Sequence, residues 1–174
     1  MKVRDLERLV SSYGVSSSKM GAVTRELRHS GRLPVKGRGP NALDLDPSLA
    51  AMVLIATAGS GKAVKADSRL NSLENLIDVS SGKNLLDAFT EILDGQSGLK
   101  DVIEVRIGRN IREASIVYTG KVVYFRQKIP RDYRSHLRVE GILPYTLLRL
   151  VSELIRMNAS FLEPNDLVEP DDDA

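Results

Sequence analysis

The sequence predicts an α+β protein, and three observations support this class. Apolar residues recur at helical spacing over most of the first 95 residues, whereas they alternate with polar residues between 102 and 125. Helical spacing returns in residues 144–158. With 174 residues, 42% of them hydrophobic and 28% charged, the chain can form a real core. This composition excludes a wholly disordered protein.

Two short helices are predicted at the N-terminus. Apolar residues at helical spacing define the first over residues 3–13 and the second over about 17–29. Gly14 lies between them, where a helix often needs a glycine as its C-terminal cap. Gly31 and Pro34 then end the second helix, because neither residue continues a helix easily.

Three further helices are predicted before residue 100. Asp46 and Pro47 form an N-cap followed by a proline at the first helical position. The helix that begins there is apolar on nearly every face as far as Ala58, so it is expected to be buried. Shorter helices are predicted over residues 70–77 and 85–93, where leucine and isoleucine recur at helical spacing.

The second half of the chain predicts a small antiparallel sheet. Residues 102–107 alternate, and residues 114–125 contain two strands joined by a hairpin turn at Thr119 and Gly120. One side of the first strand is expected to carry its apolar side chains: Ile103, Val105 and Ile107.

A basic connector over residues 128–142 and a C-terminal helix over 144–158 complete the predicted fold. Residues 161–174 are acidic and contain two prolines, so a disordered tail is expected there. These features predict three regions before that tail. They are a helical DNA-binding domain over residues 1–60, a helical linker region over 61–100, and a sheet-plus-helix domain for oligomerisation or partner binding over 101–160.

The net charge of +2 results from blocks of opposite sign. Residues 1–41 hold nine Lys/Arg and three Asp/Glu, and residues 99–158 hold twelve and six, so each block carries a net charge of +6. Residues 42–98 carry −4 and residues 159–174 carry −6. Such asymmetry indicates a polyanionic partner.

Several functional classes are disfavoured. Without cysteine, the chain has no disulfide, thiolate zinc site or cysteine nucleophile, and its two histidines lie far apart. No cofactor, metal site or small-molecule pocket is predicted, and the protein is not expected to be an enzyme. No run of eighteen apolar residues and no secretory signal is seen, so we expect a cytoplasmic protein that does not contact membranes.

The segment from Ala56 to Ala63 invites a phosphate-loop interpretation, but Ala56 replaces the first glycine of that motif and Ala63 its Ser/Thr. A helix, rather than the required strand, is predicted before it. A flexible loop is therefore the favoured interpretation, and a nucleotide hydrolase remains only an alternative.

The N-terminal helix pair has the properties that DNA binding requires. The second helix is polar on its outer face, and a helix of this kind can lie in a major groove with its N-terminal residues towards base edges. Arginine can contact guanines or phosphates, and serine and lysine can hydrogen-bond to bases. The candidate DNA-binding residues on this helix and on the basic loop after it are Ser16, Ser17, Ser18, Lys19, Thr24, Arg25, Arg28, Arg32, Lys36 and Arg38.

The stretch DLERLVSSYGVSSSKMGAVTRELRHSG resembles the helix-turn-helix proteins of bacteria and temperate phages. Gly14 occupies the usual turn position, and Met20 and Val23 occupy the usual apolar positions. The next segment, RLPVKGRG, resembles the basic wing or arm of winged relatives, which lies along the minor groove or the backbone. The resemblance covers about the first 40 residues, and Gly21 in the second helix departs from it.

We therefore expect a transcriptional regulator of bacterial or phage type that binds double-stranded DNA as a homo-oligomer, with a dimer favoured. Alternatives are a DNA-packaging subunit that resembles the small terminase of phages, and an adaptor that holds an acidic partner on its basic sheet. A helical hairpin with a merely solvated basic face is also possible. The second basic block contains aromatic residues and could contact nucleic acid, cover a sheet edge or receive the acidic tail.

Overall fold

The computed structural model confirms the α+β class. It describes residues 1–35, 44–61, 65–78, 80–95, 98–126 and 140–160. Within these residues, the helices are α1 (Val3–Ser12), α2 (Ser17–His29), α3 (Pro47–Gly59), α4 (Ala66–Leu73), α5 (Leu85–Asp94) and α6 (Tyr145–Ser160). The strands are β1 (Ile77–Asp78), β2 (Val102–Gly108), β3 (Glu113–Tyr118), β4 (Lys121–Arg126) and β5 (Glu140–Pro144). None of these helices is long and apolar enough to cross a membrane.

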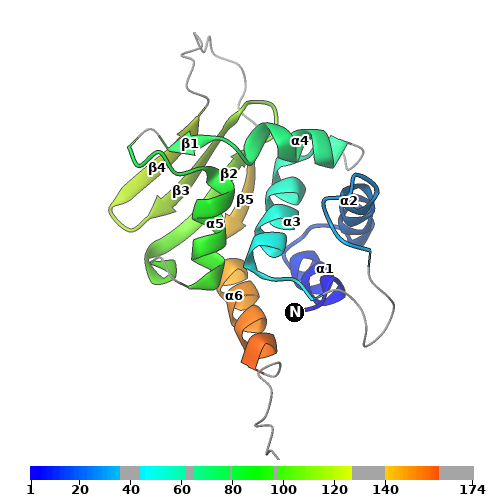
Figure 1. The fold of residues 1–174 in the computed structure, drawn as a ribbon. Coiled ribbons are helices and arrows are strands. Elements are labelled where there is room, and N and C mark those ends of the chain that lie inside the picture. Colours follow the sequence, from blue (N-terminus) through cyan, green and yellow to red (C-terminus); the bar gives the residue numbers. More distant parts are fainter. Residues whose placement is uncertain (36–43, 62–64, 79, 96–97, 127–139, 161–174) are drawn as a thin grey trace, which may run out of the picture.

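The five strands form one antiparallel sheet in the order β1-β4-β3-β2-β5. Val105 lies opposite Ile116 on β3 and Leu143 on β5, so these buried side chains share the inner face of the sheet. Figure 1 shows α3, α5 and α6 beside this sheet, with α1 and α2 on the far side of α3. Thus α3 separates the N-terminal helices from the sheet.

Helix α3 is the centre of the fold. Its side chains are buried on nearly every face, as its sequence predicts, and it contacts α2, α4, α5, α6, β2 and β5. The Asp46 carboxylate caps its N-terminus by accepting a hydrogen bond from the Leu49 N–H at 2.7 Å. A single cluster of buried side chains runs from Met1 to Ile155. The ranges predicted as separate domains therefore share one core.

The local helix signals are confirmed at most positions. Helices α1, α2, α3 and α5 begin and end within about a turn of their predicted limits. Gly95 follows α5 with a φ of 76°, which is the left-handed conformation of a helix C-terminal cap. The predicted hairpin is also present, with Gly120 at a φ of 83° between β3 and β4.

The prediction of a helix over 70–77 is wrong at both ends. Helix α4 begins earlier, at Ala66, and ends at Leu73. Ile77 and Asp78 instead form β1, which pairs with β4. The local spacing of leucines could not reveal this change, because the strand exists through its partner, which lies about fifty residues away in the sequence.

Two predictions about the sheet are also wrong. Residues 140–142, predicted as the end of the connector, belong with residues 143 and 144 to the strand β5, because they pair with the edge of β2. Ile103 does not join Val105 and Ile107 on the inner side but is 51% exposed. The pairing of β2 with β3 shifts between Val102 and Glu104, so a β-bulge turns Ile103 outwards.

Candidate nucleic-acid interface

Helices α1 and α2 pack together as a pair joined by a tight turn. Gly14 adopts a φ of 88° in this turn, a conformation that residues with a Cβ disfavour. The Thr24 hydroxyl donates a hydrogen bond to Glu7 Oε1 at 2.9 Å, which ties α2 to α1. The apolar side chains that face the core from the two helices are fully buried: Leu6, Val10, Met20, Val23 and Leu27. This pair has the short turn and the buried inner face that a helix-turn-helix requires.

Two of the predicted DNA-binding residues at the start of α2 have partners inside the protein. The Ser16 hydroxyl accepts a hydrogen bond from the Lys19 backbone N–H at 3.2 Å and caps the helix. The Lys19 ammonium group donates to the carbonyl oxygen of Ser60 at 2.8 Å. The Ser16 oxygen and one N–H of the Lys19 ammonium group thus serve contacts inside the protein.

Two more predicted DNA-binding residues stabilise the fold. Thr24 is 1% exposed and bonded to Glu7, so it lies between α1 and α2 and not on the outer face. The Arg32 guanidinium group pairs with Glu74 at 3.0 Å and with Asp67 at 3.5 Å. These ion pairs hold the end of the helix pair against α4, and no sequence pattern near Arg32 indicates them.

The remaining predicted residues of α2 lie on its exposed face. Ser17, Ser18, Arg25 and Arg28 are all exposed, and so is the neighbouring His29. Ser17 makes one exposed hydroxyl contact with Ser11, at 3.1 Å. Within the described part of the chain, the side chains of Arg25, Arg28 and His29 have no hydrogen-bond or ion-pair partner. The outer face of α2 thus presents cations that the fold does not use.

Some predicted contacts fall outside the described residues. Lys36 and Arg38 of the expected basic arm belong to residues 36–43. Most of the basic connector lies in residues 127–139, and the acidic tail lies in 161–174. These predictions stay predictions.

The structure adds two arginines that the sequence analysis did not select. Arg4 and Arg8 lie one turn apart on α1, are exposed, and have no partner among the described residues. In helix-turn-helix proteins, the first helix crosses the DNA backbone, so cations in this position can contact phosphates. Their spacing of four residues opposite the apolar face of α1 was the available signal.

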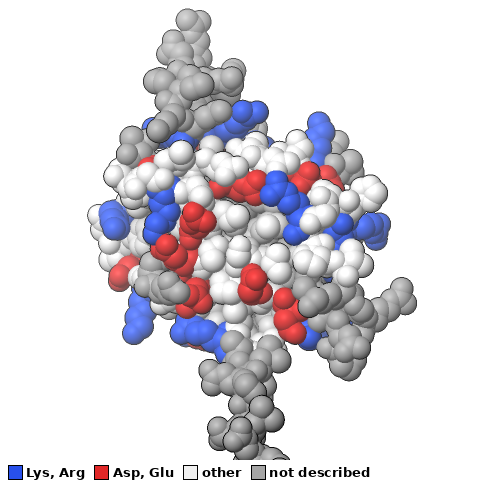
Figure 2. Space-filling model, in the orientation of Figure 1, with Lys and Arg blue, Asp and Glu red and all other residues white. Residues whose placement is uncertain are grey.

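The basic residues of the sheet are largely neutralised by neighbours. Arg106 pairs with Glu104, and Arg126 pairs with Glu113 at 2.8 Å. The guanidinium of Arg126 also lies 4.9 Å from the centre of the Tyr124 ring. Figure 2 shows a related pattern on the face drawn there, where acidic and basic side chains are interspersed. The described part of the sheet is therefore less suited to a polyanion than its sequence suggests.

The loop after α3 does not have the architecture of a phosphate loop. A helix precedes Gly59, whereas the motif requires a strand. Among the described residues, no three His, Cys, Asp or Glu side chains gather into a group that could hold a metal ion.

The chain matches no protein-family model, and no significantly similar protein was found among curated proteins or solved structures. The functional inference consequently depends on the residues described above.

Proposed function

We propose that the chain is a sequence-specific DNA-binding protein, a transcriptional regulator of bacterial or phage type. The observation that carries this proposal is the outer face of α2. It presents Arg25, Arg28 and His29 without partners in the described chain, next to the exposed hydroxyls of Ser17 and Ser18. A major groove is wide enough to admit a helix, and its base edges offer both donors and acceptors to such side chains.

The exposed residues divide into two roles. Ser17 and Ser18 are at the N-terminal end of α2, the end that enters the groove in helix-turn-helix proteins, so they are placed to read base edges. Arg25 and Arg28 contact guanines or phosphates from the same helix. Arg4 and Arg8 on α1 add phosphate contacts, which position the protein without reading sequence.

The partly buried bonds around α2 support this function indirectly. Lys19 ties the first turn of α2 to the end of α3, and Arg32 ties the residues after its last turn to α4. A recognition helix held at both ends keeps its orientation before DNA arrives, which lowers the entropy that binding costs.

A second copy of the chain is proposed to bind the outer face of the sheet. Ile142 is 56% exposed there, and Tyr124 and Val122 are each 43% exposed. The register places Ile142, Arg106, Ser115 and Tyr124 side by side across the sheet. Ser115 is only 1% exposed, so the exposed members of this row are Ile142, Arg106 and Tyr124. Because this face carries paired charges as well as apolar groups, it can be self-complementary, as a two-fold interface must be.

Replacement of Arg25 and Arg28 together by alanine tests the proposed function. Each exposed cation that contacts a phosphate contributes to a salt-dependent affinity. We therefore expect the double variant to bind duplex DNA about one hundred times more weakly than the wild type does. The slope of log K against log salt should fall by up to about 1.8. Fluorescence anisotropy with a duplex selected from a random pool measures both quantities.

The matched control removes the same charge elsewhere. Lys100 and Arg149 are exposed cations in the second half of the chain, and their double alanine variant should retain the affinity. Both double variants should unfold as the wild type does, since none of the four side chains is buried. Unchanged DNA affinity of the α2 variant would overturn the proposal.

Light scattering and duplex binding of the wild type separate the alternatives. A ring of eight or more copies in light scattering would favour a DNA-packaging subunit instead of a regulator. Failure to bind any duplex at low salt would favour an adaptor that holds an acidic protein.

A further inference from the structure

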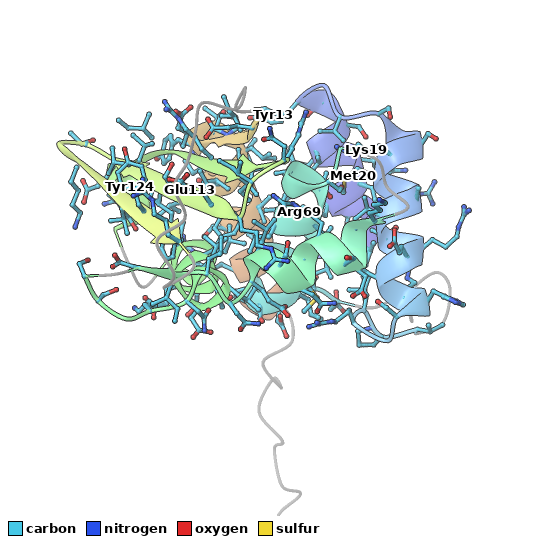
Figure 3. The ribbon with its side chains drawn as sticks, turned by 90° about the horizontal axis from the view of Figure 1, so that it is seen from above. Tyr13, Lys19, Met20, Arg69, Glu113 and Tyr124 are labelled. Carbon is cyan, nitrogen blue, oxygen red and sulfur yellow. The ribbon has the colours of Figure 1, made fainter. Side chains whose placement is uncertain are left out.

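Three cations converge on the C-terminal end of α3. Lys19 Nζ donates to the carbonyl oxygen of Ser60 at 2.8 Å, and Arg69 Nε to that of Gly59 at 3.3 Å. Arg109 Nε donates to the carbonyl oxygen of Ala58 at 3.1 Å. These side chains come from α2, from α4 and from the connection between β2 and β3. Figure 3, which looks down on this end of the molecule, shows Lys19 and Arg69 close to the end of α3.

The positive charge here exceeds what the helix end needs. The C-terminus of a helix carries about half an elementary negative charge. Lys19, Arg69 and Arg109 together bring three positive charges to it. Within the described residues, the side-chain hydrogen bonds of all three go to carbonyl and hydroxyl oxygens and none to a carboxylate. A surplus of positive charge is therefore left at this site.

The hollow next to this helix end is also lined by positive charge. It encloses about 360 Å³ and is lined by Gly59, Ser60, Gly61, Lys65, Arg69 and Arg109. None of these residues is acidic, and Lys65 is exposed without a partner in the described chain. The cations thus surround a space and do not simply cover a helix end.

Burial and mutual repulsion disfavour the charged forms of the cations at this site. Burial lowers the pKa of Lys19, and the nearby Arg109 lowers it further. Burial and the charge of Arg112 act in the same way on the pKa of Arg69. A bound anion would reverse these effects, because it would stabilise the charged forms.

Ser60 provides an independent sign of a ligand. It lines the hollow and is 2% exposed, yet its hydroxyl oxygen has no hydrogen-bond partner in the described part of the chain. Buried hydroxyls are nearly always paired, because an unpaired one loses the hydrogen bonds that it makes to water in the unfolded chain. A ligand oxygen that reached this hydroxyl would give it a hydrogen-bond partner.

We infer that this hollow, with the cations around it, binds a phosphate group. The Nη donors of Arg109, which make no hydrogen bond in the described chain, and hydroxyl donors match phosphate oxygens. Inorganic phosphate and phosphate monoesters carry up to two negative charges and balance several cations, whereas each phosphate of a DNA backbone carries one. Lys65, Arg69 and Arg109 supply the charge, and Ser60 donates its unused hydroxyl. The phosphate belongs either to a DNA backbone or to a free phosphorylated compound. Only the first of these sources depends on the proposed function.

Inorganic phosphate is the probe, and the full chain is titrated with it. Thermal unfolding is compared in sodium phosphate and in sodium chloride at equal ionic strength, and the backbone amides of Ser60 and Gly61 are followed by NMR. We expect a Kd of the order of 1 mM, a Tm higher by a few degrees in phosphate, and shifts at both amides.

Two variants locate the site. Lys65→Gln and Ser60→Ala should each weaken phosphate binding by about three- to tenfold. Neither removes a hydrogen bond of the described fold, so their Tm in chloride should not fall. Lys121→Gln removes an exposed lysine from the distant hairpin and should bind phosphate as the wild type does.

The outcomes are decisive in both directions. No phosphate-specific shift in the wild type, or equal affinity in the two pocket variants, overturns the inference. If the pocket variants also bind duplex DNA more weakly, the phosphate is part of a DNA backbone. If they lose phosphate binding but keep DNA affinity, the ligand is a free phosphorylated compound. Loss of DNA binding in the α2 variant with phosphate binding intact would separate the two proposals.

Discussion

At Gly141, the backbone of β5 crosses α3 with no room for a side chain. A Cβ atom there would lie 2.2 Å from the carbonyl oxygen of Ala58, which is part of the backbone of α3 and cannot move aside alone. Gly21 on α2 is the opposite case, because a Cβ there would have nothing within 4 Å. The same substitution therefore has opposite consequences at the two positions.

We expect Gly141→Ala to lower the free energy of unfolding by about 1–3 kcal/mol or more, because the sheet and α3 must separate to admit the methyl group. Gly21→Ala should raise it by about 0.4–1 kcal/mol, because alanine favours the helix and restricts the unfolded chain. Urea denaturation at neutral pH measures both. Equal stability of the two variants would contradict this account of β5 and α3.

The exposure of basic residues on α2 was easier to predict than the contacts that basic residues make inside the protein. The exposed positions Arg25 and Arg28 follow from the polar face of α2 alone. The partners of Lys19 and Arg32 do not, because Ser60 and Glu74 lie 41 and 42 residues away in the sequence. A basic residue on a polar helix face therefore indicates DNA contact only where no distant residue of the protein pairs with it.

Among the elements, the turn after β1 depends on one carboxylate. Asp78 is 7% exposed and accepts hydrogen bonds from the backbone N–H and hydroxyl groups of Ser80 and Ser81. Burial raises the pKa of Asp78, but the bonds from Ser81 and Ser80 outweigh burial, so the pKa lies below its ordinary value. The ionised form thus stabilises the turn.

This pKa predicts a pH-dependent stability. The folded-state pKa lies below the unfolded one, so the unfolded chain binds the proton first as the pH falls. The stabilisation is complete above about pH 5 and is lost as the pH falls through the folded-state pKa. We expect Asp78→Asn to lower the free energy of unfolding by about 1–3 kcal/mol near pH 7, with a smaller difference at about pH 3.

Urea denaturation at the two pH values measures this difference. Asp101→Asn is the control, because Asp101 is exposed and its side chain has no hydrogen bond in the described chain. A gap between wild type and Asp78→Asn that is the same at both pH values would contradict the assignment.

The elements that local signals define were predicted well, and those that distant pairing defines were not. The serine cap, the turn glycines and the apolar spacing of α1, α2 and α5 all lie within the helices or next to them. By contrast, β1 and β5 are short, and each exists because another strand offers an edge. The bulge at Ile103 has the same origin, since it is a property of the pairing of β2 with β3.

For the whole molecule, the exposed side chains of the row on the sheet allow the proposed association of two copies to be tested. Ile142→Glu places a charge on the outer face at a position that is 56% exposed, so the monomer should stay folded while the dimer dissociates. We expect a monomer mass in light scattering and weaker DNA binding, because two half-sites can no longer be bound together.

Val35→Glu is the matched control, because Val35 is 80% exposed and lies outside the sheet. It should leave the mass unchanged. A monomeric wild type, or an Ile142→Glu variant that remains dimeric, would show that copies do not associate through this face.

The place of β5 beside β2 also affects how the chain is made on the ribosome. Residues 102–126 complete a three-stranded meander by themselves, but the edge of β2 stays open until residues 140–144 have been synthesised. An open strand edge is a site for pairing with other chains. Until residues 140–144 have left the ribosome and paired with β2, therefore, the newly made protein can aggregate through this edge.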